Sequence, residues 1–156
     1  MKESQAKPVR KPIRLRSTIF ECIDKKAAYM GLRTGTLANR ILEEELDKVK
    51  RAGIDHCVRR GSKAYENLTP EEQAGKNYYV IPAKESIEIH MPNRGEGDGS
   101  NQVSFYMTEA QLNLLEDIVR FQNIKGTVDA GKVLTLRYAV VGLLLNNEVL
   151  SKVYVP

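Results

Sequence analysis

Hydrophobic and basic residues alternate near the start of the chain, between residues 12 and 17. Ile13 and Leu15 fall on one face of an extended segment and Arg14 and Arg16 on the other, because successive side chains of a strand point to opposite sides. A strand on its own leaves its backbone N–H and C=O groups without partners. We therefore expect it to pair with the same segment of a second copy, in an antiparallel ribbon.

Two amphipathic helices are predicted directly after this strand. Thr18 and Glu21 fit a capping box, and the helical pattern that follows ends at Gly31. Thr34 to Thr36 opens the second helix, in which the run Glu43 to Glu45 is expected on the solvated face. The apolar positions are Ile19, Phe20, Ile23, Ala27 and Met30 in the first helix and Leu37, Ala38, Ile41, Leu42 and Leu46 in the second.

The middle of the chain gives weaker signals. Thr69 to Glu72 is typical of a short helix start, with Pro at the first helical position. A strand is predicted at Tyr78 to Pro82, and the alternation in Ser86 to Met91 predicts another. Pro92 to Asn101 is expected to be a loop, because it is rich in glycine and polar residues.

The opening pattern returns in the last third of the chain. Val103, Phe105 and Met107 alternate with polar residues, and Thr108 to Gln111 fits a helix start. Two helices are expected after it, the first over Leu112, Leu115, Ile118 and Val119 and the second from near Asp129 to about Val149. Counted back from Thr18 and Thr108, the apolar strand positions share one register, which indicates that a strand-helix-helix unit occurs twice.

Charge is concentrated in the first third of the chain. The net charge of +4 hides an uneven distribution, since residues 1–51 hold 13 Lys or Arg against 7 Asp or Glu and residues 102–156 hold 5 of each. A clustered basic segment is typical of a nucleic-acid contact surface. No apolar run reaches the length of a membrane span, and the N-terminus lacks the apolar core of a secretory signal, so a cytoplasmic location is expected. Cys22 and Cys57 are expected to be reduced thiols.

The segment from residue 11 to 50 resembles the ribbon-helix-helix family of DNA-binding proteins, that of the Arc and methionine repressors. The resemblance lies in Ile13-Arg14-Leu15-Arg16, in Gly31-Leu32-Arg33-Thr34 between the helices, and in the apolar stripe of Leu37, Ile41 and Leu42. It implies an intertwined dimer whose two-stranded ribbon enters the major groove. On this chain the base-reading residues would be Arg14 and Arg16, and a guanidinium fork matches guanine O6 and N7.

A phosphate contact is expected at the start of the second helix, where unpaired backbone N–H groups and the helix dipole favour an anion. The expected phosphate-binding residues are Lys11, Arg33, Thr34, Gly35 and Thr36, with Lys7 and Arg10 as further candidates in a flexible arm. The second unit, residues 102–149, carries Ser104 and Tyr106 where arginines would read bases, so a tandem ribbon-helix-helix chain would have a degenerate second unit. We expect that unit to oligomerise, with a smaller possibility that its strand pairs with the first or contacts DNA through Gln102 and Tyr106.

Together these patterns predict an α+β, mainly helical fold, with an N-terminal ribbon-helix-helix dimer and a C-terminal strand-helix-helix module. The expected divisions are a flexible basic arm at 1–10, a DNA-binding domain at 11–51, a linker at 52–85 and the oligomerisation module at 86–156. The predicted function is sequence-specific binding of double-stranded DNA as a homodimer or higher oligomer, in a transcriptional repressor. Two alternatives stay open: an accessory DNA-binding protein of plasmid transfer or partition, and an antitoxin-like factor whose C-terminal module grips a protein.

Catalysis is not expected, because no nucleophile lies beside a base and no carboxylates pair in an apolar setting. His56 and Cys57 are adjacent, and adjacent residues rarely bind one metal ion. The glycine-rich segment 95–100 lacks the Lys of a phosphate-binding loop. No enzyme activity, cofactor or metal is therefore predicted.

Overall fold

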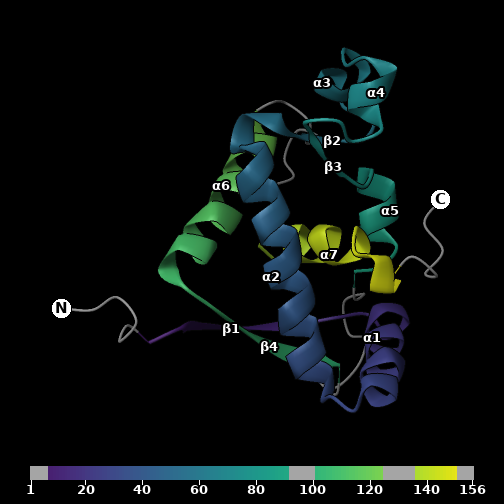
Figure 1. Cartoon of the computed structure of the whole chain (residues 1–156), viewed down its shortest axis with the longest axis vertical. Coiled ribbons are helices and arrows are strands. Elements are labelled where there is room, and N and C mark those ends of the chain that lie inside the picture. The colour runs from purple at the N-terminus through teal and green to yellow at the C-terminus, as the bar shows by residue number, and fades with distance from the viewer. Residues whose placement is uncertain (1–6, 92–100, 125–135, 151–156) are drawn as a thin grey trace.

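The computed structural model describes residues 7–91, 101–124 and 136–150, and these form an α+β fold made mostly of helices (Figure 1). The strands form two small sheets of two strands each. The elements in chain order are β1 (Val9–Arg14), α1 (Ser17–Met30), α2 (Thr34–Ala52), η2 (Ile54–His56), β2 (Cys57–Arg59), α3 (Lys63–Glu66), α4 (Pro70–Gln73), β3 (Tyr79–Ile81), α5 (Lys84–Glu88), β4 (Gln102–Met107), α6 (Glu109–Ile124), α7 (Leu136–Leu145) and η3 (Glu148–Leu150).

The two helices predicted after the first strand are present as α1 and α2. Gly31 ends α1 in the left-handed region at φ 73°, as the sequence indicates, since glycine adopts this conformation without steric cost. The start of α1 differs from the prediction: Arg16 is the N-cap, without a side-chain cap bond. The hydroxyl of Thr18 lies 3.1 Å from Nδ1 of His90, so the capping box expected at Thr18 is wrong.

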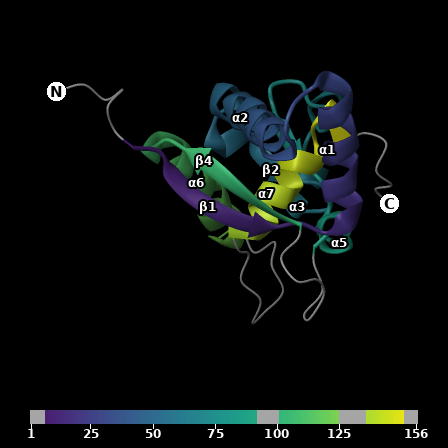
Figure 2. The same ribbon diagram turned by 90° about the horizontal axis from the view of Figure 1, so that it is seen from below.

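The partner of β1 is β4 of the same chain, and the two strands run antiparallel. Figure 2 shows them side by side. We expected the second strand to come from another copy. The chain supplies it instead, because the second strand-helix-helix unit carries an apolar face that matches that of the first.

The second unit consists of β4, α6 and α7. Thr108 and Gln111 exchange the two bonds of a helix-start box: the backbone N–H of Gln111 donates to the Thr108 hydroxyl, and the N–H of Thr108 donates to the Gln111 side-chain oxygen. The helix start predicted there is confirmed. The helix expected from near Asp129 to about Val149 is present in part, as α7 from Leu136 to Leu145, and residues 125–135 lie outside the described residues.

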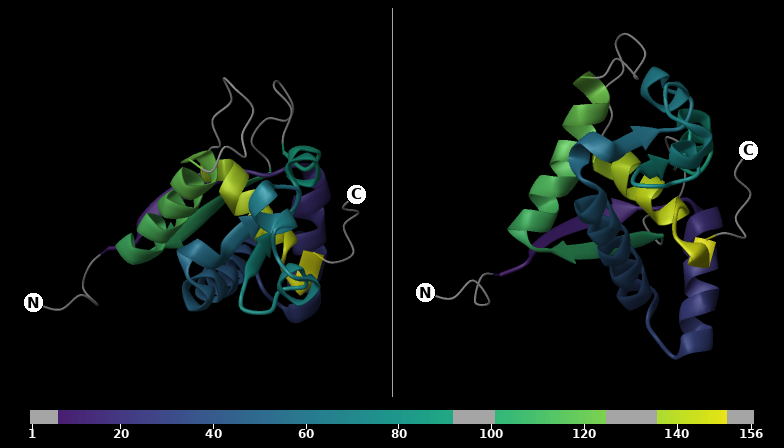
Figure 3. Two further views of the ribbon diagram at one scale, coloured as in Figure 1. Left: turned by 90° about the horizontal axis from the view of Figure 1, so that it is seen from above. Right: turned by 45° about the horizontal axis from the view of Figure 1, so that its top comes forward.

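The second helices of the two units, α2 and α7, pack against each other, and Figure 1 and Figure 3 show them crossing. α1 packs on α2, and α6 packs on α7. The buried apolar side chains of both units belong to one hydrophobic cluster, which includes Ile13, Ile23, Phe105 and Leu115. The ribbon's inner face therefore closes a core to which both units contribute.

The two units are set 92 residues apart, since α1 begins at Ser17 and α6 at Glu109. This spacing relates Ile23 to Leu115, and both side chains are fully buried. It also relates Pro12 to Ser104, and these two residues are cross-strand partners. The two strands of the ribbon are therefore related by an approximate two-fold axis at the Pro12–Ser104 pair. The register that the sequence predicts, counted back from Thr18 and Thr108, differs from this spacing by two residues. A shift of two residues leaves every strand side chain on the same face.

Residues 53–91 form an insertion between the two units. It holds the parallel pair β2 and β3, the short 3-10 helix η2 and the short α-helices α3, α4 and α5, and it buries Cys57, Tyr79 and Ile81 in the shared core. The strand predicted at Tyr78 to Pro82 and the helix start at Thr69 are confirmed. The segment expected to be a linker thus carries regular structure, and Figure 1 shows its helices α3 and α4 beyond the end of α2 that lies away from the ribbon.

The strand predicted at Ser86 to Met91 is wrong, because this segment begins in helix α5 and continues into a turn. A strand would place Ile87 and Ile89 on one face. Ile87 is fully buried, whereas Ile89 is 41% exposed. Three alternating apolar residues cannot distinguish a half-buried strand from a short helix followed by a turn.

Candidate nucleic-acid interface

The outer face of the β1-β4 ribbon is polar and basic. Counted through the register, it carries three cross-strand pairs: Arg10 opposite Tyr106, Pro12 opposite Ser104 and Arg14 opposite Gln102. Alternation places these six residues on the face opposite the buried one. All six are exposed or half-buried, and Tyr106 is 55% exposed.

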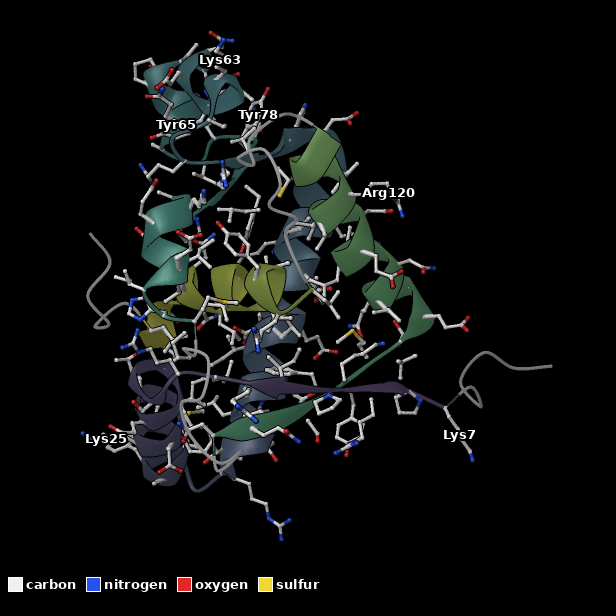
Figure 4. All side chains as sticks on the ribbon, turned by 180° about the vertical axis from the view of Figure 1, so that it is seen from behind. Lys7, Lys25, Lys63, Tyr65, Tyr78 and Arg120 are labelled. Carbon is white, nitrogen blue, oxygen red and sulfur yellow. The ribbon has the colours of Figure 1, made fainter. Side chains whose placement is uncertain are left out.

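Arg10 and Arg14 are the two arginines that the strand carries on this face. Arg10 Nε donates a hydrogen bond of 3.1 Å to the Ser104 hydroxyl across the ribbon. Arg14 is half-buried at the other end of β1. Lys7, just before the strand, extends away from the ribbon's end in Figure 4 and adds positive charge there. Two guanidinium groups thus lie on one strand of a narrow two-stranded surface.

Arg16, predicted to read bases beside Arg14, lies outside the ribbon. It is the N-cap residue of α1, and its Nη1 donates a 2.7 Å hydrogen bond to the backbone oxygen of Ile89 in the insertion. The structure therefore gives Arg16 a contact that ties the insertion to the end of the ribbon. The strand ends two residues earlier than the alternation suggested.

Lys11, predicted to bind phosphate, falls on the inner face of β1. Its cross-strand partner is Phe105, a fully buried residue, and the side chain of Lys11 is half-buried. Strand alternation separates it from Arg10 and Arg14. The structure does not bring Lys11 together with the other predicted contact residues.

The start of α2 lies beside the outer face of β4. Arg33 is the N-cap and Thr34 the first helical residue, and the first backbone N–H groups of a helix have no intrahelical acceptor. The Thr34 hydroxyl donates to the Asp24 carboxyl group of α1, which fixes the loop between the helices. The predicted phosphate residues other than Lys11 meet the predicted secondary contacts in one groove of about 500 Å³, whose lining includes Arg33, Thr34, Gly35, Thr36, Gln102, Ser104 and Tyr106.

Asn39 of α2 holds β4 in place. Its side-chain N–H donates to the backbone oxygen of Ser104 at 2.9 Å, and its side-chain oxygen accepts from the backbone N–H of Tyr106 at 2.7 Å. A second donation to the Gly35 backbone oxygen, at 2.8 Å, ties the same amide to the first turn of α2. Asn39 therefore fixes the distance between the helix start and the outward side chains of β4.

Sequence reasoning placed Arg10 in a flexible arm as a phosphate candidate rather than on the ribbon, doubted DNA contact at Ser104, and missed Asn39 altogether. Arg10 could have been found by continuing the alternation of Arg14 backwards through Pro12. Proline is tolerated in β1 because both strands of a two-stranded ribbon are edge strands. Asn39 carried no signal, because its role depends on the pairing of β4 with a strand more than 80 residues away.

A buried polar cluster lies in the C-terminal half of α2. Glu45 is 1% exposed, which corrects the expectation that the whole Glu43 to Glu45 run is solvated. Its carboxyl oxygens accept from the hydroxyl of Tyr79 at 2.7 Å, from Asn147 Nδ2 at 2.9 Å and from Lys48 Nζ at 2.9 Å. Burial, and next the charge of Glu45, raise the pKa of Tyr79 above its usual range. This cluster joins α2 to the insertion and to the segment after α7.

Within residues 7–91, 101–124 and 136–150, no helix is both long and apolar enough to cross a bilayer. In the same ranges, no group of three or more His, Cys, Asp or Glu side chains is arranged to hold a metal ion. Comparisons of the chain with family models, with curated proteins and with solved structures found no match.

Proposed function

We propose that this protein binds double-stranded DNA sequence-specifically by placing the β1-β4 ribbon in the major groove. The observation that carries the proposal is the outer ribbon face, where Arg10 and Arg14 of β1 stand opposite Tyr106 and Gln102 of the antiparallel strand β4. A two-stranded ribbon fits the major groove, and these side-chain types form the bidentate contacts that distinguish base pairs. In this proposal the chain acts as a transcriptional repressor, since a bound protein occludes a promoter.

The groove beside the ribbon supports the same function. A phosphate at the start of α2 would meet backbone N–H groups, the positive end of the helix dipole and the exposed Arg33. Such a contact fixes the protein on the duplex without reading sequence. The groove adjoins the outward residues of β4, as a DNA backbone flanking an inserted ribbon requires.

The arrangement also supports the resemblance to ribbon-helix-helix proteins, with one change. In that family two copies contribute one strand each, whereas here β1 and β4 of one chain provide both strands. We propose that a single chain is the DNA-reading unit. Arg10 replaces Arg16 as the second base-reading arginine.

The test is a gel shift with a library of genomic fragments. The wild-type protein is expected to retain a subset of fragments. Arg10→Ala/Arg14→Ala is expected to lose roughly 100-fold or more in affinity for them, because each bidentate arginine gives about 1 to 3 kcal/mol of discrimination.

The matched control is Lys25→Ala/Lys63→Ala, which removes the same charge from exposed positions off the ribbon (Figure 4). This variant should bind the selected fragments within about threefold of wild type. If no fragment is preferred, or if the arginine variant keeps the wild-type preference, the proposed function is wrong.

A further inference from the structure

The two halves of the outer ribbon face are chemically unequal. The spacing of 92 residues relates Arg10 to Gln102 and Arg14 to Tyr106. In a ribbon made from two identical strands, residues related in this way would be identical. Here β1 contributes both arginines, and β4 contributes a glutamine and a tyrosine at the matching positions.

Each end of the ribbon therefore presents a different pair. At one end Arg14 stands opposite Gln102, whose amide suits the N6 and N7 atoms of adenine. At the other end Arg10 stands opposite Tyr106, which offers one hydroxyl and an apolar ring rather than an amide. Directly opposite residues have Cβ atoms about 5 Å apart, so each pair addresses neighbouring bases.

The two arginines also fix a spacing. They are four residues apart on one strand, and an extended strand rises about 3.3 Å per residue, which separates them by about 13 Å. Successive phosphates along one DNA strand advance about 3.4 Å, so 13 Å spans about four base pairs. Nothing on β4 repeats this spacing with arginines, because its outward residues are Gln102, Ser104 and Tyr106.

We infer that one chain recognises a non-palindromic DNA site, in which two guanines about four base pairs apart are read from β1 and an adenine next to one of them is read by Gln102. The inference rests on the proposed function, since it names the class of DNA site that the same ribbon face binds. The direction of the site along the duplex follows from the asymmetry: the Arg14 end and the Arg10 end are not interchangeable.

The experiment is selection of binding sites from a randomised duplex library by the full chain, with the mass of the selected complex measured by native mass spectrometry. The expected result is a consensus without dyad symmetry, bound by one chain. The Gln102→Ala variant is expected to lose about tenfold in its preference for adenine, and at one base pair only. It removes the two hydrogen bonds from Gln102 to that adenine, while the arginine contacts stay.

The sharpest comparison uses Gln102→Arg/Tyr106→Arg, which gives β4 arginines at the two positions that match Arg10 and Arg14 of β1. Both positions are exposed, so the fold should be kept, and circular dichroism checks this. This variant is expected to select a site with dyad symmetry and guanine contacts on both DNA strands. A wild-type consensus that is itself symmetric about its centre would overturn the inference while leaving the proposed function intact. The absence of any wild-type consensus would instead overturn the proposed function, and this inference with it.

Discussion

The first and the second strand-helix-helix units share a backbone arrangement but differ in their polar and charged side chains. Both have an inward apolar strand face and a first helix with a fully buried aliphatic residue, Ile23 or Leu115, at the same place. The outward faces differ, because the arginines are on β1 alone. The second helices differ as well: α2 carries Asn39 and the buried Glu45, whereas eight successive residues of α7, from Tyr138 to Leu145, are buried. The repeat thus preserves what packing requires and varies what faces outward.

Of the differences between α2 and α7, the buried carboxylate of Glu45 in α2 is expected to have the largest effect on stability. Glu45→Ala is expected to lower the free energy of unfolding by about 3 kcal/mol, because it leaves the hydroxyl of Tyr79 and the amide of Asn147 buried without their acceptor. Urea denaturation measures the loss. Glu43→Ala, an exposed neighbour on the same helix, should change stability by less than about 0.5 kcal/mol. Equal effects of the two substitutions would show that the buried cluster does not hold the units together.

The two helices also use glycine differently. A Cβ at Gly142 of α7 would lie 3.0 Å from Cδ1 of Ile87 and 3.3 Å from Cγ2 of Ile81, whereas a Cβ at Gly35 of α2 would meet nothing within 4 Å. Gly142→Val is therefore expected to destabilise the protein by about 2 kcal/mol through overpacking. Gly35→Ala should stabilise it by up to about 1 kcal/mol, because alanine favours a helix. Thermal unfolding of both variants decides the contrast, and destabilisation by both would contradict it.

Through Asn39, α2 of the first unit contacts β4, the strand of the second unit. Asn39→Ala is expected to cost about 1 to 2 kcal/mol of stability through the loss of two hydrogen bonds to β4. It should also weaken binding to a selected DNA fragment several-fold, since β4 is no longer held beside the start of α2. Denaturation and gel shift measure the two effects. A variant that loses stability and keeps full affinity would show that Asn39 serves the fold alone.

The effect that is smallest at neutral pH is a dependence of stability on pH in the insertion that separates the units. Burial raises the pKa of Cys57 from 9.0 to about 12. The unfolded thiol ionises first, so the stability that this group contributes is complete below about pH 9 and is lost as the pH rises from 9 to 12. Urea denaturation of the wild type and Cys57→Ala between pH 8 and 11 measures the slope. The free energy of unfolding of Cys57→Ala should decline less steeply with pH than that of the wild type. An identical slope would contradict the raised pKa of Cys57.

Local sequence patterns predicted many of the elements of this fold. The alternation at Ile13 to Arg16 and at Val103 to Met107 predicted both ribbon strands, and the helical spacing predicted α1, α2 and α6. The pairing of β1 with β4 was underestimated, because contact between strands so far apart leaves no trace in either local pattern. Arg16 and Lys11 were misplaced for a related reason: their roles depend on where the strand ends and on which face its partner covers. The burial of Glu45 depends on Tyr79 and Asn147, which come from distant segments.

Asn39 has a consequence for how the protein behaves in a crowded solution. A two-stranded ribbon has two outer edges, and an exposed edge with unpaired backbone groups invites strands from other molecules to add to it. At Ser104 and Tyr106 the Asn39 amide already satisfies the backbone oxygen and N–H that an added strand would use. One side chain thus protects this edge of the ribbon against edge-to-edge aggregation, while the outward face remains exposed.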